Sequence, residues 1–432
     1  MAEVLIAGAG IGGLATALAL QRQGQDFELW EQASVLGEVG AGIQLGPNVT
    51  RILQQWGLDD ALRDVAVQPS ALVSCDAITG REVGRLSLHD MAPRYGAPYM
   101  TVHRADLHAV LLHAIEDPAS ALHLNRTLSQ VQLDSQGGLV VRDEEGHEAA
   151  PQALIGADGL WSRVRQQVWQ DVAPTPTGHW AYRSLLPMSL LPKRWREPQV
   201  RVWMAPGMHA VHYPVRRGEW LNVVLLIEGS DAMAQSGWDV NRAPELIQAD
   251  VQRALRGLCH DVHDVLRLVE QWRVWSLHAR PVVRSAQDLV RSRVALLGDA
   301  AHPMLPYLAQ GAGMALEDAQ ALAQWKQVGR VSSDPIELNR QLIEYATLAS
   351  QRHVFGVVFW FSLLAAFGLG PLGAVLYRLA AITHRSWTTQ TQESMPEPGA
   401  VFEVSERAWH HVDWLSARVT AMMFAIAGNF ED

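Results

Sequence analysis

The glycines near the start of the chain, in the stretch Gly8-Ala-Gly10-Ile-Gly12-Gly13, have a spacing that suits phosphate binding. In such a loop Gly8 makes a tight turn, Gly10 lets the backbone approach a pyrophosphate, and Gly13 lets a helix pack closely on a strand. The N–H groups at the start of that helix attract the phosphates. Glu31, 23 residues after Gly8, stands where an acid accepts hydrogen bonds from a ribose diol. The alternative is a glycine-rich turn with an unrelated surface glutamate.

Two later segments place an aspartate directly after a buried strand. Asp158 follows Leu154-Ile-Gly-Ala, and taken alone it could equally be a turn with a helix-capping aspartate. Asp299 leads through a proline-containing loop to Gly311 and Gly313, where a helix begins. An aspartate there can bind a ribityl or ribose hydroxyl, and the helix start can stabilise negative charge on a bound ring.

The elements that must position these residues follow from the hydrophobic pattern. Val4–Ala7 is a buried strand, a helix runs from about Ile11 to Gln23 and stops at Gly24, and Phe27–Trp30 is a second strand. This βαβ opening predicts an α/β fold with a parallel, doubly wound, Rossmann-like sheet.

A second, mostly antiparallel sheet is predicted to be interleaved with the first. Its strands are alternating or apolar stretches and lie at 180–185, 199–204, 208–213 and 220–227. The chain then returns to the first sheet through a buried strand at 293–297 and a helix at 314–325. We therefore expect a nucleotide domain at 1–175, with part of 70–100 contributing to the substrate region. A substrate domain follows at 176–285. The chain returns to the nucleotide domain at 286–330 and ends in C-terminal helices at 331–432.

The composition excludes several classes of protein. The 432 residues include 35 Lys and Arg against 45 Asp and Glu, a formal net charge of −10, which argues against a nucleic-acid partner. With 48% hydrophobic and 19% charged residues the chain can bury a core. Only Cys75 and Cys259 are present and the 17 His form no HExxH motif, so neither a disulfide framework nor a metal site is expected. With no basic and apolar leader, we expect a cytoplasmic protein.

One segment complicates that expectation. Residues 354–377 are 24 residues without a charge, long enough to cross a bilayer. Because glycines and Pro371 interrupt the segment, buried packing or a homodimer interface is the favoured interpretation. Peripheral membrane contact is the alternative. The apolar tail after Leu415 has no functional interpretation.

The three glycine and aspartate segments, in this order and spacing, resemble the class A flavoprotein monooxygenases, the p-hydroxybenzoate hydroxylase-like family, over about residues 3–330. The resemblance implies that the first segment and its acid bind the ADP half of FAD, that the second contacts FAD and a nicotinamide donor, and that the third holds the flavin. It also places an arginine near the FAD phosphates. The implied cofactor-binding residues are Gly8, Gly10, Gly13, Glu31, Arg104, Asp158, Asp299, Gly311 and Gly313.

Other stretches, at 37–48, 94–99 and 208–214, are similar to the small hydroxybenzoate hydroxylases of this family, whose substrates include 3-hydroxybenzoate, salicylate and 6-hydroxynicotinate. The resemblance implies that a catalytic His and Tyr, four residues apart, fall on His209 and Tyr213. It also implies that Tyr99 lies near the substrate and Gln44 close to the flavin, both as substrate-binding residues.

The spacing of His209 and Tyr213 has its own physical logic. Residues i, i+2 and i+4 of a strand share a face, so His209 and Tyr213 point one way and His212, a structural residue in this interpretation, points the other. A phenol has a reference pKa of about 10, so a histidine with a pKa of about 6.5 is a useful acceptor for its proton at neutral pH. Deprotonation of the phenol makes the substrate ring electron-rich enough to attack an electrophilic peroxide.

Two departures limit the choice of substrate. Pro306 stands where the 3-hydroxybenzoate enzyme has a glutamine beside the flavin, and the 6-hydroxynicotinate pattern has histidines in place of Gln44 and Tyr307. We therefore expect a monooxygenase that uses FAD, NADH or NADPH and O₂ to hydroxylate a phenolic aromatic acid through a flavin C4a-hydroperoxide. The alternatives are a membrane-associated hydroxylase of a lipophilic quinone precursor and a non-catalytic FAD-binding protein. The ring substrate, the position hydroxylated and the choice of nicotinamide are left open.

Overall fold

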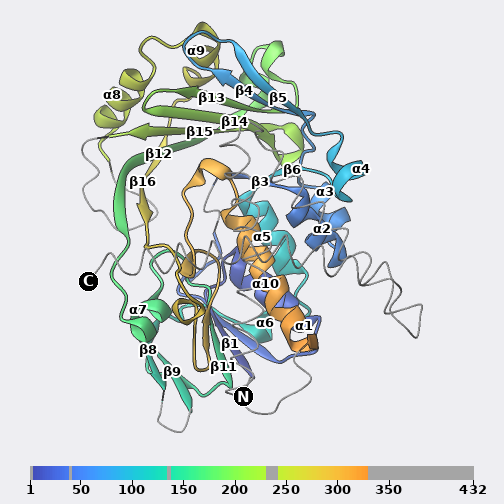
Figure 1. Cartoon of the computed structure of the whole chain (residues 1–432), viewed down its shortest axis with the longest axis vertical. Coiled ribbons are helices and arrows are strands. Elements are labelled where there is room, and N and C mark those ends of the chain that lie inside the picture. The colour runs from blue at the N-terminus through green and yellow to red at the C-terminus, as the bar shows by residue number, and fades with distance from the viewer. Residues whose placement is uncertain (1–2, 38–40, 134–137, 230–241, 329–432) are drawn as a thin grey trace, which may run out of the picture. The chain divides into compact units, whose positions relative to one another are not determined.

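The computed structural model describes residues 3–37, 41–133, 138–229 and 242–328 (Figure 1). Residues 1–283 and 288–328 belong to one compact unit that contains both large sheets. The domain boundaries near 175 and 285 therefore stay a prediction. The expected C-terminal helices, the segment 354–377 and the tail after Leu415 lie outside the described residues. In the part that is described, no helix has both the length and the apolar character needed to cross a bilayer.

The first large sheet is the expected Rossmann-like one. Its six strands lie in the order β17-β18-β11-β1-β2-β7, and all neighbours are parallel except β17 and β18. The strands are β1 (Val4–Ala7), β2 (Phe27–Trp30), β7 (Leu122–His123), β11 (Ala153–Gly156), β17 (Val290–Arg291) and β18 (Val294–Leu296). Ile6 joins the hydrophobic core on one side of β1, whereas Leu5 and Ala7 join the core on the other. Both faces of the strand are buried, which explains its continuous apolar sequence.

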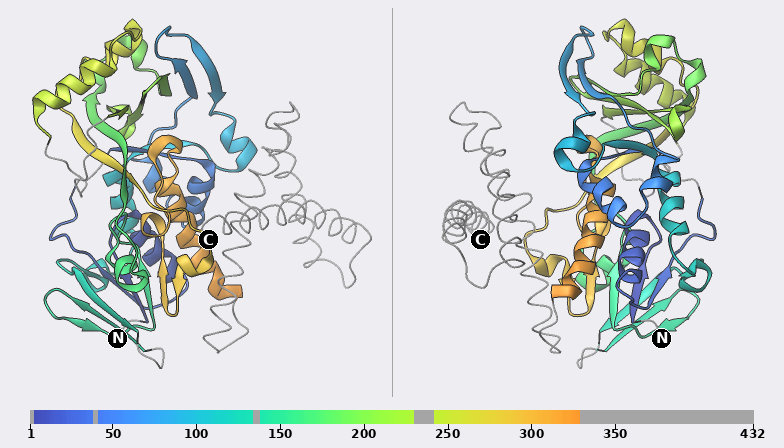
Figure 2. Two further views of the ribbon diagram at one scale, coloured as in Figure 1. Left: turned by 60° about the vertical axis from the view of Figure 1, so that its left-hand side comes forward. Right: turned by 90° about the vertical axis from the view of Figure 1, so that its right-hand side faces the viewer.

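The core around Ile6 is closed by helices α1 (Ile11–Gln21), α2 (Pro47–Gln55), α5 (Arg104–His113) and α10 (Gly311–Val328). Figure 2 shows the orange α10 beside the blue N-terminal helices. Helix α1 ends two residues before the predicted end, because Arg22 caps it and Gly24 turns the chain with a φ of +63°. The N–H of Gly24 donates to the carbonyl of Gln21, which closes this turn.

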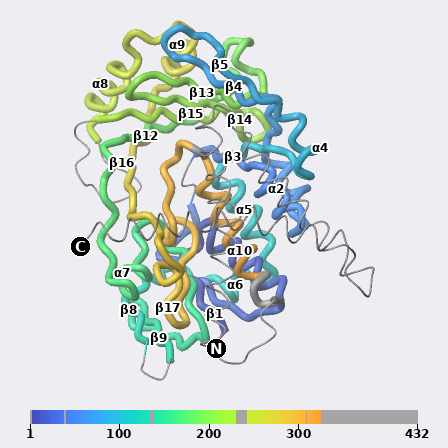
Figure 3. The backbone as a smooth tube through the Cα atoms, in the orientation of Figure 1, coloured from blue at the N-terminus to red at the C-terminus, as the bar shows by residue number. Residues whose placement is uncertain are grey.

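The second large sheet has the order β16-β12-β15-β14-β13-β4-β5 and is antiparallel except between β13 and β4, as expected. Its strands are β4 (Ala71–Asp76), β5 (Glu82–Ser87), β12 (Thr175–Pro187), β13 (Gln199–Ala205), β14 (Met208–Val215), β15 (Trp220–Glu228) and β16 (Arg273–Ala279). Figure 3 traces the blue β4 and β5 to the edge of this sheet, so the early segment near 70–100 does contribute to it.

One face of this sheet packs on α8 (Pro244–Ala254) and α9 (His260–Leu266). On the opposite side lies a two-stranded sheet of β3 (Gly42–Leu45) and β6 (Met100–His103) (Figure 1). The Asn222 side chain accepts a hydrogen bond from the N–H of Gly42 at 2.7 Å, which ties the two sheets together. This second face therefore looks toward the nucleotide-binding segments.

The remaining elements connect these layers. The helices are α3 (Asp59–Arg63), α4 (Met91–Tyr95), α6 (Pro118–Ala121) and α7 (Arg163–Trp169), and a three-stranded sheet consists of β8 (Leu128–Leu133), β9 (Leu139–Asp143) and β10 (Glu148–Ala149). Short 3₁₀ turns are η1 (Met188–Leu190), η2 (Lys193–Trp195), η3 (Arg216–Gly218), η4 (Ala286–Asp288), η5 (Gly298–Ala300) and η6 (Pro306–Leu308).

Candidate active site

The glycine loop between β1 and α1 has two positions that exclude a side chain. A Cβ on Gly8, whose φ is +101°, would lie 2.5 Å from the carbonyl oxygen of Ala157, and a Cβ on Gly13 would lie 1.8 Å from that of Gly8. Gly10 is different, because the nearest heavy atom to its Cβ position is Arg104 Nη2 at 3.8 Å. The loop is thus tightly packed where strand and helix meet and open at Gly10, as a pyrophosphate site requires.

Glu31, at the end of β2, is joined to this loop. Its carboxylate accepts hydrogen bonds from the N–H of Ala9 at 2.7 Å and from that of Ala33 at 2.9 Å. The His108 ring on α5 lies 2.7 Å from the carbonyl oxygen of Ala9, so both backbone polar groups of Ala9 have a side-chain partner. Glu31 thereby fixes the loop, and each of its oxygens keeps a lone pair with which to accept from a ribose.

Arg104 begins α5 and extends toward Gly10. Burial lowers the pKa of its guanidinium, and the carboxylates of Asp299 and Glu31 oppose that shift. An arginine in this position brings a positive charge to the open side of the glycine loop. That charge fits a diphosphate.

Asp158 follows β11 and has a divided role. Its Oδ2 accepts hydrogen bonds from the N–H groups of Arg163 at 2.7 Å and Val164 at 3.0 Å, in the first turn of α7. This is the helix-capping role that the sequence left open. Its Oδ1 is buried with no hydrogen-bond partner among the described residues, and burial raises the pKa of the carboxyl. A buried oxygen without a donor marks a place for a hydroxyl or amide of a bound cofactor.

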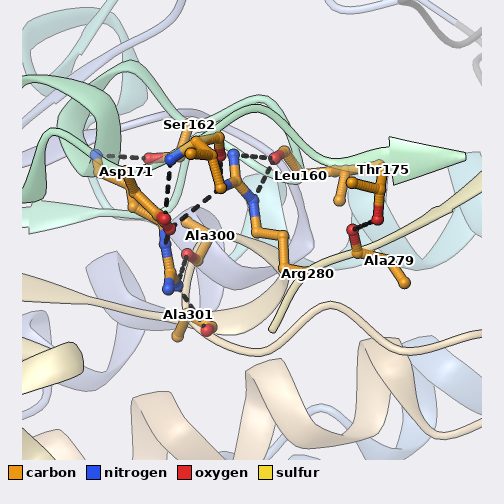
Figure 4. A network of polar contacts seen from close by, with 10 residues as sticks. Leu160, Ser162, Asp171, Thr175, Ala279, Arg280, Ala300 and Ala301 are labelled. Atoms are coloured by element: carbon orange, nitrogen blue, oxygen red, sulfur yellow. Dashed lines mark hydrogen bonds and ion pairs between the residues drawn. The ribbon is translucent and has the colours of Figure 1, made fainter. Parts of the chain in front are cut away.

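A buried network that the sequence analysis missed connects the second and third segments (Figure 4). Arg165 on α7 donates to the carbonyl oxygens of Ala300 at 3.0 Å and Ala301 at 2.8 Å. Arg280 donates to the carbonyl oxygen of Leu160 through Nε at 3.0 Å and Nη2 at 2.9 Å. Both arginines pair with Asp171. Arg165 follows Asp158 closely in the sequence, but nothing local in the sequence marks its partners Arg280 and Asp171.

Asp299 lies in η5, beside the start of α10. A Cβ on Gly311 would lie 3.8 Å from its Oδ1, so the aspartate lies beside the N-terminus of α10. Burial raises the pKa of Asp299, while His302 and Arg104 oppose that shift. Asp318 on α10 closes the loop by accepting from the N–H of Gly298 at 2.9 Å and lying 2.7 Å from His302 Nε2.

Gly313 is needed for packing. A Cβ at this position would lie 2.8 Å from Val49 Cγ2 on α2. The structure therefore gives this glycine a helix-packing reason, whether or not a cofactor also approaches it.

On β14 the alternation of side chains is as predicted. Tyr213 and Val211 pack with Tyr99 in one apolar cluster on the face toward β3 and β6. His212 points to the other face, where it is 4% exposed and accepts a hydrogen bond from Trp203 Nε1 at 3.1 Å. Burial lowers the pKa of His212 to about 3, so this histidine is a neutral part of the core.

Gln44, Tyr99 and Tyr213 come together from three different strands or loops. The Tyr99 hydroxyl donates to Gln44 Oε1 at 2.6 Å, and the Gln44 side chain also reaches the Tyr213 hydroxyl. Burial raises the pKa of both tyrosines, so both hydroxyls keep their protons at neutral pH. This cluster offers polar groups in an otherwise apolar wall.

His209 lies toward the other end of the same face. Its ring stands edge-on to the Tyr307 ring with the centroids 5.9 Å apart, and the Tyr307 hydroxyl bonds His179 Nδ1. Burial lowers the pKa of His209, so the ring is neutral and able to accept a proton at neutral pH. Four residues of a strand span about 13 Å between His209 and Tyr213. In the sequence, Tyr307 stands out only as a departure from similar enzymes, and no local pattern marks His179.

Metal ligands are scarce in the described residues. One group of three, His260, Asp261 and Asp264, lies at α9, away from these segments, and Arg194 pairs with both aspartates. Because the guanidinium of Arg194 already pairs with this acidic group, we assign no metal to it.

Comparisons with known proteins agree with this geometry. A family described as an FAD binding domain matches residues 1–327. The 3-hydroxybenzoate 6-hydroxylase of Polaromonas naphthalenivorans is 37% identical over 322 residues, which cover 74% of this chain and 78% of the relative. The 6-hydroxynicotinate 3-monooxygenase of Bordetella bronchiseptica is 34% identical over 334 residues, covering 76% of this chain and 83% of the relative.

Among solved structures, Klebsiella pneumoniae HpxO complexed with FAD and uric acid has a similar fold, with a TM-score of 0.67. The two sequences are 22% identical, and the match covers 98% of this chain and 95% of that one. The glycine loop open at Gly10, the arginine beside it and the unpartnered oxygen of Asp158 all suit the cofactor. The chain belongs to the FAD-binding family of aromatic monooxygenases and is an FAD-dependent oxidoreductase of that family.

Proposed function

We propose that this protein hydroxylates a small phenolic aromatic acid, with NADH or NADPH as electron donor and O₂ as oxidant. The observation that carries the proposal is the face of the second sheet, where a neutral histidine and a cluster of two tyrosines and a glutamine look toward the FAD-binding segments. The names of the relatives support it, since 3-hydroxybenzoate and 6-hydroxynicotinate are both hydroxylated ring acids.

The proposed roles of the FAD-binding residues follow from their positions. The backbone at Gly10 and the guanidinium of Arg104 would hold the diphosphate. The Oδ1 atom of Asp158 and the carboxyl of Asp299, beside the α10 N-terminus, would accept from hydroxyl groups of the cofactor. Bound FAD supplies the activation of O₂, which no side chain can provide.

The substrate chemistry is proposed for His209 and its neighbours. A neutral His209 would accept the phenolic proton of the substrate, and the resulting phenolate has more electron density on the ring carbons ortho and para to its oxygen. Tyr307 stands edge-on to the histidine ring and, held by His179, limits its rotation. At the other end of the face Tyr213, Gln44 and Tyr99 would orient the ring through hydrogen bonds.

The test is oxidation of NADH and of NADPH by the purified yellow protein with a panel of ring compounds. The panel is salicylate, 3-hydroxybenzoate, 4-hydroxybenzoate, 6-hydroxynicotinate and a prenylated phenol, with peroxide measured in the same samples. We expect one small acid to give fast oxidation, little peroxide and a hydroxylated product. Slow oxidation with every small acid, or oxidation that ends only in peroxide, overturns the proposal. Product from the prenylated phenol alone would replace the small acids with a lipophilic substrate.

A further inference from the structure

Arg183 stands on the proposed substrate face and has no role in the chemistry described so far. It lies on β12, paired with Val224 of β15, which in turn pairs with Val211 of β14. Directly paired residues in an antiparallel sheet share a face, so Arg183 points the same way as Val211, which lies between His209 and Tyr213. His179, four residues earlier on β12, contacts Tyr307 from this same face.

The surroundings of Arg183 are unusual for an arginine. Its guanidinium carbon lies 4.0 Å above the Trp275 ring, and its Nε is buried with no hydrogen-bond partner among the described residues. Burial lowers the pKa of Arg183 to about 10, and the groups that act on it electrostatically are Tyr213 and Arg104, neither of them a carboxylate. A buried cation ordinarily has an anionic partner, because an uncompensated buried charge is strongly destabilising.

Three other buried arginines of this unit show the ordinary pattern. Arg165 and Arg280 share the carboxylate of Asp171, and Arg242 pairs with Asp250 at 2.6 Å on the opposite face of the sheet. Arg242 resembles Arg183 in stacking on a ring, that of Trp180 at 4.7 Å, and in having a buried Nε without a partner among the described residues. Arg183 differs from all three because no carboxylate of the described residues acts on its charge. Its position therefore suits an anion that arrives with a ligand.

We propose that Arg183 binds the carboxylate of the aromatic substrate. This inference rests on the proposed function, because it assigns the acid group of a phenolic acid whose hydroxyl lies at His209. The planar guanidinium offers parallel N–H groups that match the two oxygens of a carboxylate, and stacking on Trp275 holds that plane in place. Arg183 lies two strands from Val211, about 10 Å across the sheet. An aromatic acid lying over this face of the sheet, above β15, could thus contact His209 at one end and Arg183 at the other.

The experiment measures binding and turnover separately. Binding is followed by the change in the flavin absorbance of the holoenzyme on titration with benzoate and with benzamide. Benzoate has the carboxylate but no phenolic hydroxyl, so its binding reports on Arg183 even if no phenolic acid is hydroxylated. Turnover is followed as kcat and KM for the best acid of the panel and for its amide.

We expect Arg183→Gln to weaken binding of benzoate and to raise KM for the acid by roughly 10- to 100-fold, the range of a charged hydrogen-bonded contact. Benzamide binding and FAD content should stay unchanged. Arg183→Lys keeps the charge but loses the planar pair of donors, so we expect an intermediate loss. The matched control is Arg273→Gln, since Arg273 pairs with Arg183 across β12 and β16 and is exposed.

The proposal is overturned if Arg183→Gln weakens benzoate and benzamide equally, or if it releases FAD without changing the preference for the acid. The second result would assign the guanidinium to the flavin. If Arg183→Gln does not fold, Arg183→Lys decides by its ratio of benzoate to benzamide affinity, and an unchanged ratio overturns the proposal. Tight benzoate binding that depends on Arg183, in an enzyme that hydroxylates no phenolic acid, would refute the proposed function and keep the anion site.

Discussion

Gly13 in the nucleotide-binding segment and His209 on the second sheet are held in place by different physical effects. Around Gly13 the site is made of backbone, and a side chain is excluded because its Cβ would lie 1.8 Å from the carbonyl oxygen of Gly8. Around His209 the site is made of side chains, with Tyr307 edge-on at 5.9 Å and His179 behind it. The two halves should therefore respond differently to substitution.

This difference predicts which residues tolerate substitution and which do not. A backbone site recognises groups such as a pyrophosphate and tolerates almost no change, because neighbouring peptides leave no room to adjust. A side-chain site on a rigid sheet can exchange individual residues while the sheet stays intact. Tyr307, one of the positions where this chain departs from the similar enzymes, contacts His209 and His179 and so belongs to the side-chain half.

The largest effect is expected from Gly13→Ala. The new methyl must push α1 away from β1, since the atom it meets is backbone. We expect loss of bound FAD and of most folded protein, measured by the flavin absorbance per protein and by the melting temperature. Gly84→Ala is the control, because no atom lies within 4 Å of its Cβ position. A Gly13→Ala protein with full flavin content would contradict the backbone argument.

Gly10→Ala sharpens the same point. Its nearest neighbour would be the Arg104 side chain at 3.8 Å, so the protein should fold with an unchanged melting temperature in the FAD-free state. Binding of FAD should weaken by about tenfold or more, because a methyl keeps the pyrophosphate from the backbone. Unchanged FAD affinity would place the diphosphate elsewhere.

In the side-chain half, the largest effect is expected from His209→Asn. Loss of a general base lowers the rate by about 10²- to 10⁴-fold, so hydroxylation should fall within that range while FAD content is unchanged and more peroxide forms per NAD(P)H. In the wild type, kcat/KM should fall on acidification with a midpoint below 6.5, because burial lowers the pKa of this histidine. The variant should lose that limb of the pH profile, and the exposed His89→Asn should keep it. Equal product yield from both variants would remove His209 from the mechanism.

A smaller effect is expected from Tyr99→Phe. The change deletes the hydrogen bond to Gln44 Oε1, and a net contribution of about 0.5–1.5 kcal/mol predicts a roughly 2- to 10-fold rise in KM with little change in kcat. Tyr95→Phe removes the same atom from a ring that is 52% exposed and serves as the control. If both variants behave alike, the Gln44 cluster does not position the substrate.

The smallest effect at neutral pH concerns stability. The pKa of native His212 is about 3, below its ordinary value of about 6.5, so between these values only the unfolded chain takes up a proton at this site. Stability is therefore lost as the pH falls from about 6.5 toward 3. We expect the melting temperature of the wild type to fall more steeply than that of His212→Gln over this range, since the variant has nothing to titrate there. A constant difference between the two proteins would show that His212 titrates normally.

Short-range patterns carried the prediction of the nucleotide half. β1, the glycine loop, α1 and β2 all lie within about 30 residues, and their order follows from apolar runs and glycine spacing. The prediction of α1 was two residues too long, because the apolar pattern does not show where the capping hydrogen bonds form. Individual strands of the second sheet were also predictable from alternation, as was the face shared by His209 and Tyr213.

The sequence by itself determined the βαβ opening, the family and which residues of a single strand share a face. It could do so because sterics and periodicity act between close neighbours in the chain. Only the tertiary structure decided which distant side chains meet. Tyr307 and His179 are 128 residues apart, and Arg280 and Leu160 are 120 apart. The place of Arg183 beside Trp275, where no carboxylate of the described residues acts on its charge, likewise depends on the packing of β12 against β16. Such contacts leave no local pattern, since they depend on where each chain segment lies in the folded protein.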